Sequence, residues 1–145
     1  MRTLTKISSY LTAVGCVLVI MLLTNCSKTV PETERVTSLL KSGTWKIQTA
    51  TADGVDQTTI YKNFTITFTD KNFTTVSGSV VWSATGTWTF VSDAAKAFTR
   101  DDSIVVGIDN ITDTALSLSL TWTKTTLSGG RSASLAGKNI FVFGK

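Results

Sequence analysis

The chain has 145 residues, with 14 Lys+Arg against 10 Asp+Glu, two cysteines and no histidine. The absence of histidine excludes a Ser-His-Asp or Cys-His nucleophile and a zinc site built on imidazole. Lysine and arginine do not cluster as they do in a nucleic-acid footprint, so we expect no nucleic-acid partner.

The N-terminal segment has the layout of a secretion signal. Arg2 and Lys6 precede a mostly apolar, uncharged run over residues 11–23, and Cys26 follows. A run of about 13 residues is too short to span a hydrocarbon core of about 30 Å, but it fits the apolar part of a signal peptide. We therefore predict a signal peptide over residues 1–25, with a short uncleaved membrane anchor as the alternative.

The residues around Cys26 indicate how the signal ends. Residues 23–26, Leu-Thr-Asn-Cys, resemble the lipobox of bacterial lipoproteins, although Asn25 departs from the usual small residue. The resemblance implies cleavage before Cys26, attachment of lipid (palmitate among its chains) to the Cys26 sulfur, and a cell-envelope location at the outer membrane. Cys16 would leave with the signal, so the mature chain has no disulfide.

A polar tether and one domain are predicted after the signal. Residues 26–38 hold the lipidated cysteine and the only proline, and residues 39–145 form the domain. Within this stretch, residues 36–41 are predicted to form a turn of helix whose two leucines cover one end of the fold.

From Gly43 onward, apolar and polar residues alternate with period two, as in half-buried strands. The alternation predicts about eight strands, over residues 44–51, 58–69, 72–77, 79–83, 86–91, 103–107, 115–123 and 138–143, with a possible ninth near 131–135. Turns are predicted at Asp53-Gly54, 70–72, Thr85-Gly86 and Gly129-Gly130, with a bulge at Gly78 and a loop or short helix over 92–102.

Such short strands in sequence predict an all-β fold. We expect an antiparallel meander that closes into a small barrel, because each strand has one apolar face to bury. A β-sandwich is the alternative.

The opening of the first strand resembles a known family. Gly43-Thr44-Trp45 is similar to the Gly-x-Trp that begins strand one in lipocalins and the wider calycin group, and residues 86–88 repeat the spacing. Together with the signal, the cysteine and the tether, the domain resembles the small lipocalin-like lipoproteins of Bacteroidota.

The resemblance also implies a closing residue for the barrel. In lipocalins a basic side chain from a late strand packs across the opening tryptophan, which here is Trp45 beside Gly43. Lys124, Arg131 and Lys138 are the candidates. We choose Arg131, because a planar guanidinium stacks well on an indole.

The large apolar side chains on the alternating strands either line a ligand pocket or fill the core. These candidates are Trp45, Phe64, Phe68, Trp82, Trp88, Phe90, Leu118 and Trp122. An eight-stranded barrel is just wide enough for side chains or for one small ligand, so both possibilities stay open.

No catalytic, metal or cofactor site is predicted. Asp101 and Asp102 are neighbours, and a strand would point them to opposite faces, so they do not form a glycosidase pair and more simply start a turn. Two short patterns around Ser103 and Thr114, Asp-Ser-Ile and Asp-Thr-Ala, resemble O-glycosylation sites of Bacteroidota.

Two non-enzymatic functions follow from this pattern. The first is a membrane-anchored, lipocalin-like lipoprotein that binds a small apolar ligand in its barrel. The second is a structural or interaction lipoprotein of the envelope whose barrel is filled by side chains. An open, apolar-lined cavity would favour the first function, and a packed centre would favour the second.

Overall fold

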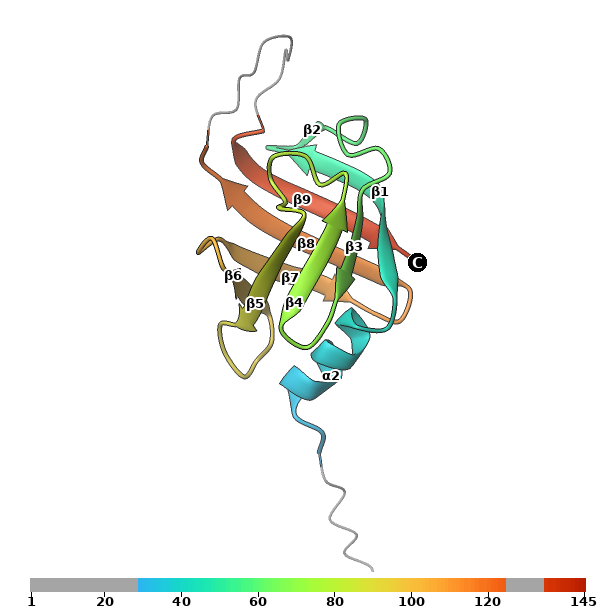
Figure 1. Cartoon of the computed structure of the whole chain (residues 1–145), viewed down its shortest axis with the longest axis vertical. Coiled ribbons are helices and arrows are strands. Elements are labelled where there is room, and N and C mark those ends of the chain that lie inside the picture. The colour runs from blue at the N-terminus through green and yellow to red at the C-terminus, as the bar shows by residue number, and fades with distance from the viewer. Residues whose placement is uncertain (1–28, 125–134) are drawn as a thin grey trace, which may run out of the picture.

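A closed antiparallel β-barrel forms the body of the molecule in the computed structural model, which describes residues 29–124 and 135–145 (Figure 1). Its strands follow one another around the wall in the order of the sequence, and the last strand pairs with the first. They are β1 (Thr44–Ala52), β3 (Thr65–Phe68), β4 (Asn72–Val76), β5 (Thr85–Phe90), β6 (Ala97–Arg100), β7 (Val105–Ile111), β8 (Ala115–Trp122) and β9 (Gly137–Gly144). The predicted all-β meander and its closure into a barrel are confirmed, and the sandwich alternative is wrong.

A short hairpin extends the first strand. The two-residue strand β2 (Val55–Asp56) folds back on the end of β1. Asp53 and Gly54 form the turn between them with φ values of 47° and 81°, the positive φ at both positions that a tight hairpin requires. The predicted Asp53-Gly54 turn is therefore confirmed.

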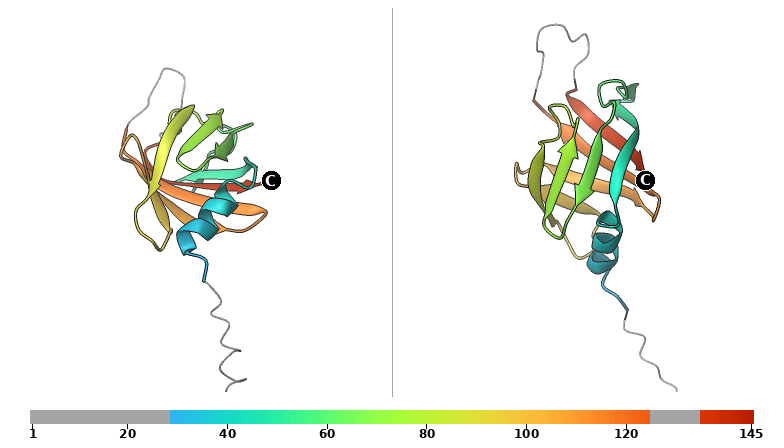
Figure 2. Two further views of the ribbon diagram at one scale, coloured as in Figure 1. Left: turned by 60° about the horizontal axis from the view of Figure 1, so that its bottom comes forward. Right: turned by 45° about the vertical axis from the view of Figure 1, so that its right-hand side comes forward.

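Helix α2 (Glu32–Leu40) lies at one end of the barrel (Figure 2). It begins earlier than the predicted turn over residues 36–41, because Glu32 and Glu34 in its first turn favour the positive end of the helix dipole. Of the described part of the predicted tether, residues 29–31 precede the helix. Val36 and Leu40 are buried and close this end of the barrel.

The predicted strand over residues 58–69 is wrong in its first half. Successive turns occupy this stretch, with backbone hydrogen bonds from Ile60 to Gln57 and from Phe64 to Tyr61. The Asp56 carboxylate accepts hydrogen bonds from the backbone N–H and the hydroxyl of Thr58, and this side-chain turn competes with a strand. The strand begins only at Thr65.

The predicted strand over residues 79–83 is also wrong, as is the bulge at Gly78. Residues 77–84 form a loop at the barrel end opposite helix α2 (Figure 1), and its Val81 and Trp82 point into the core. Two adjacent buried residues do not fit the alternation of a strand.

Other differences lie in β5, β6 and β7. The predicted Thr85-Gly86 turn belongs to β5, where a Cβ on Gly86 would lie 2.5 Å from Cζ of Phe73, so glycine is needed for close packing. The predicted loop over 92–102 contains β6, and β7 begins at Val105 rather than at residue 103.

Several predictions lie outside the described residues. These are the signal peptide, Cys26, the Gly129-Gly130 turn and Arg131. The short strand predicted near 131–135 also lies outside the described residues, apart from its last residue. That residue, Leu135, is buried but is not part of a strand.

Candidate functional site

Aromatic side chains fill the interior of the barrel. Of the eight ligand-lining or core candidates, Phe90 is half-buried and seven are buried, namely Trp45, Phe64, Phe68, Trp82, Trp88, Leu118 and Trp122. Phe141 stands at the centre of this packing, with ring centroids 5.0 Å from Tyr61, 5.9 Å from Phe64 and 5.8 Å from Trp82. These side chains form a packed core rather than the wall of an open cavity.

The four tryptophans differ in what their N–H groups meet. Trp45 Nε1 donates to the Leu40 carbonyl at 2.9 Å, and Trp88 Nε1 lies 3.1 Å from the Thr69 carbonyl. Trp82 and Trp122 are buried, and no described residue offers a hydrogen-bond partner for their Nε1 atoms. A buried indole N–H usually finds an acceptor, so these two positions stand out.

A basic side chain does cover the opening tryptophan, and it comes from Lys145. Its Nζ lies 4.9 Å from the ring centroid of Trp45 and donates to the Ser42 hydroxyl at 2.7 Å. Gly43 lies close by, since a Cβ there would be 3.8 Å from Lys145 Cε. The sequence analysis did not name Lys145. The signal that could have found it is its position, two residues after the buried Phe143 and just beyond the end of β9.

Lys124 and Lys138, the other basic candidates, lie elsewhere. Lys124 Nζ is 5.3 Å from the ring centroid of Trp122, and the exposed Lys138 lies on β9.

A buried guanidinium is the most unusual group inside the barrel. Arg100 sits at the end of β6, and its side chain is 1% exposed. Its Nε donates to Asp102 at 3.1 Å, its Nη2 pairs with the same carboxylate, and its Nη1 donates to the Val81 carbonyl at 2.8 Å. The guanidinium carbon also lies 4.8 Å from the centroid of Trp82 and 5.9 Å from that of Phe73. We call these five residues the Arg100 cluster.

The Arg100 cluster joins two loops at one end of the barrel. Asp102 lies in the turn between β6 and β7, as predicted for this Asp pair, while Val81 and Trp82 belong to residues 77–84. Burial of the charge is tolerated because a carboxylate and a carbonyl accept its hydrogen bonds. Alternation of Phe98 and Arg100 along β6 was the signal in the sequence that Arg100 points inward.

The Arg100 pairing also sets the ionisation of Asp102. Partial burial alone would raise the pKa of this carboxyl. The hydrogen bonds and charge of Arg100, the Ile104 backbone N–H and the charge of Lys124 together outweigh burial, so the pKa of Asp102 lies below its ordinary value. Asp102 is therefore ionised at neutral pH and forms an ion pair with Arg100.

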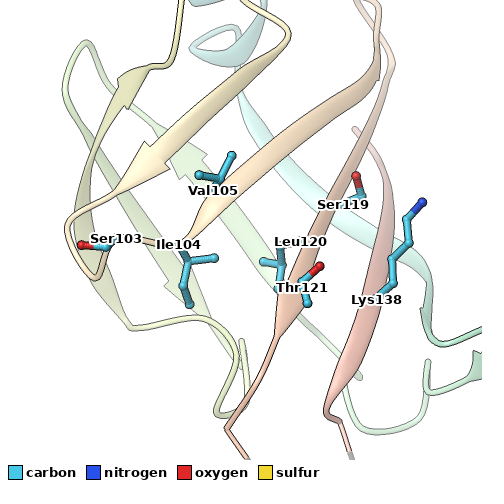
Figure 3. A pocket seen from close by; sticks show the side chains of 7 residues that line it. All are labelled: Ser103, Ile104, Val105, Ser119, Leu120, Thr121 and Lys138. Carbon is cyan, nitrogen blue, oxygen red and sulfur yellow. The ribbon is translucent and has the colours of Figure 1, made fainter.

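A hollow of about 440 Å³ opens on the outside of the barrel wall (Figure 3). It lies where β7 and β8 separate, since their pairing ends at Val106 and Leu120 while β8 continues to Trp122 beside β9. We call it the outer hollow, and it is lined by Ser103, Ile104, Val105, Ser119, Leu120, Thr121 and Lys138.

The outer hollow combines an apolar floor with a polar rim. Val105 is 53% exposed, so its aliphatic side chain is available for contact, as are those of several other valines in the described part of the chain. Ser103, Ser119 and Thr121 add hydroxyl groups to the lining, and the exposed Lys138 takes part in none of the three ion pairs between described residues. This arrangement can hold an apolar group that has an acceptor or a negative charge beside it.

The described residues, 29–124 and 135–145, form neither a metal site nor a membrane-spanning helix. No group of three or more Cys, Asp or Glu side chains there could hold a metal ion. No helix there has the length and apolar character needed to cross a bilayer. Ser103 and Thr114 both lie in exposed turns, between β6 and β7 and between β7 and β8.

Comparison with known proteins gives no relatives. No family model, curated protein or solved structure matches the chain. The site is therefore interpreted from its own geometry.

Proposed function

We propose that the protein is a non-enzymatic, membrane-anchored β-barrel that recognises another component of the cell envelope through its outer surface. The packed interior supports this proposal most directly, because the aromatic core leaves the barrel centre to side chains. Because side chains fill the barrel, we expect the envelope partner to contact its loops and outer walls.

The proposed anchor determines which end of the barrel faces the membrane. Lipid on Cys26 would be joined to helix α2, which begins at Glu32, by a segment that can span at most about 20 Å even when fully extended. The helix end of the barrel would then stay near the bilayer. The outer hollow, on the side wall, would remain open to a partner.

The chemistry of the outer hollow suggests what the partner presents. Val105 and Ile104 would contact an apolar side chain, while Lys138 would contact a neighbouring carboxylate or carbonyl. Interfaces commonly combine an apolar centre with a polar rim in this way. We infer a protein segment with an aliphatic or aromatic residue next to an acidic one.

A photo-crosslinking amino acid at Thr121, in the outer hollow, tests the proposal in cells that make the full, anchored chain. Thr74 is the matched control, because it is an exposed threonine on β4, at the opposite side of the strand order. We expect a discrete crosslinked adduct from Thr121 and none from Thr74. Val105→Asp should abolish the adduct, whereas Val76→Asp on β4 should leave it unchanged.

Two outcomes would contradict the proposal. Equal adducts from both positions would indicate non-specific contact, and an adduct that survives Val105→Asp would place the interface elsewhere.

Carriage of a small apolar ligand is the second candidate function, and it is supported by the apolar side chains of Ile104, Val105 and Leu120 in the outer hollow. Hollows of about 300–1,000 Å³ are the size that small molecules occupy. Native mass spectrometry of the chain purified from its own membranes separates the two candidates. We expect the mass of the lipidated chain alone, and a constant added mass would favour ligand carriage.

A further inference from the structure

The side chain of Trp82 occupies the barrel interior although it does not belong to a strand. It lies in the 77–84 loop and is 2% exposed. Its ring centroid is 6.0 Å from that of Phe64 and 5.8 Å from those of Phe73 and Phe141. A barrel of this strand number has room inside for side chains or one small ligand, and here a loop supplies part of the filling.

The buried position of Trp82 is incompletely satisfied. Its Nε1–H has no acceptor within residues 29–124 and 135–145, which disfavours burial relative to an indole with a partner. The loop backbone is also strained, because Ser77 and Ser79 both have φ of 57°, a region that side-chain-bearing residues rarely adopt. The contacts of Trp82 in the core therefore compensate for an unfavourable backbone conformation of the loop.

Removal of Trp82 would leave a space with defined chemistry. Phe64, Phe73 and Phe141 would form its walls, and the face of the Arg100 guanidinium would border it. If the loop moved out, Arg100 Nη1 would lose its acceptor, which is the Val81 carbonyl. A replacement must therefore supply both a flat ring and an oxygen acceptor.

The charge of such a replacement follows from Asp102. The Asp102 carboxylate already pairs with Arg100 through Nε and Nη2, so the positive charge is neutralised. A second anion beside this carboxylate would be repelled. The space therefore suits an uncharged molecule.

We propose that the volume filled by Trp82 is a latent binding site for a small, neutral, planar aromatic molecule that bears a carbonyl oxygen. The molecule stacks where the indole lies, accepts the Arg100 Nη1 hydrogen bond, and binds when the 77–84 loop turns outward. This site is separate from the outer hollow, and its existence does not depend on the function proposed for that surface.

The test is a titration of the full lipidated chain, labelled with ¹⁵N, in detergent micelles. The probe is indole-3-carboxaldehyde, with indole and indole-3-carboxylate as matched probes that lack the acceptor or add a charge. We expect the aldehyde to shift the Trp82 indole N–H signal and to accelerate its hydrogen exchange. The aldehyde should bind at least tenfold more tightly than either matched probe.

A variant that disfavours the inward position of the 77–84 loop makes the test stronger. A Cβ on Gly78 would lie 2.6 Å from Trp82 Cβ, so Gly78→Ala should push the loop outward while Trp82 is retained. Apparent affinity rises with the population of the open state, so this variant should bind the aldehyde more tightly than the parent.

The proposal fails if the Trp82 signal is unchanged in both the parent and Gly78→Ala up to the solubility limit of the probe. It also fails if all three probes act equally, because that result reports partition into micelles. Perturbation confined to Thr121 and Lys138 would assign the binding to the outer hollow instead.

Discussion

Asp102→Asn should destabilise the protein strongly at neutral pH. The substitution keeps the size of the side chain but removes the negative charge opposite the guanidinium of Arg100, whose side chain is 1% exposed. Breaking a buried ion pair by removal of one partner costs about 3–5 kcal/mol, because the other charge stays buried. Asp102 is 31% exposed, so water can replace part of the lost interaction, and we expect a loss of about 3 kcal/mol in the free energy of unfolding.

The pH dependence of this loss gives a sharper test than its size. The pKa of Asp102 is lowered in the folded state, so the carboxylate contributes stability above its unfolded pKa of about 3.9. That contribution disappears as the pH falls through the lower folded pKa. The difference between parent and Asp102→Asn should therefore be full at pH 7 and small at pH 2.

Urea titrations of both proteins at several pH values measure this difference. The double variant with Arg100→Met provides the control, since Asp102→Asn should cost far less once the guanidinium is absent. A difference of equal size at pH 7 and pH 2, or no coupling between the two positions, would refute the assignment of a buried ion pair.

Three further predictions concern the core, the barrel end and the anchor. Leu118→Ala should lower the free energy of unfolding by about 2–5 kcal/mol in a denaturant titration, because Leu118 is fully buried on β8. Lys145→Ala should cost about 0.5–1 kcal/mol through the lost contact with Trp45, whereas the exposed Lys138→Ala should change stability by less than about 0.5 kcal/mol. Cys26→Ser should release the protein from the membrane fraction, since firm anchoring needs more than one acyl chain; retention in the pellet would contradict lipidation.

The sequence predicted those strands in which alternation is unbroken. In β8 the residues from Leu116 to Trp122 alternate between buried and accessible, and the period-two pattern located this strand to within one residue. The prediction of a closed meander rested on several such runs, and it holds because neighbouring strands in sequence are neighbours in the wall.

The pattern failed where buried residues follow a different spacing. Tyr61 and Phe64 are both buried but lie three positions apart on successive turns, and Val81 and Trp82 are buried as neighbours. Neither spacing is that of a strand. A stricter count of alternating residues would therefore have argued against a strand in both segments. Their places inside the barrel depend on contacts with distant residues, which local patterns do not contain.

The candidate sites were less predictable than the fold. The outer hollow exists because β7 and β8 stop pairing at Val106 while β8 continues, and no local pattern indicates where two strands separate. The pairing of Lys145 with Trp45 likewise depends on closure of β9 against β1. The resemblance to lipocalins implied a basic residue over Trp45 and favoured Arg131, which lies outside the described residues, whereas the structure places Lys145 over this ring.

The Arg100 cluster shows why a small barrel would keep a buried charge. Replacement of a buried ion pair by apolar residues is often neutral or stabilising, so stability alone does not explain the arginine. Its hydrogen bond to the Val81 carbonyl and its contact with the Trp82 ring both favour the inward position of the 77–84 loop. An apolar residue at position 100 could pack equally well against several loop conformations, whereas directed hydrogen bonds select one. We therefore expect Arg100→Met to retain a cooperative fold while hydrogen exchange in residues 77–84 becomes faster than in the rest of the barrel.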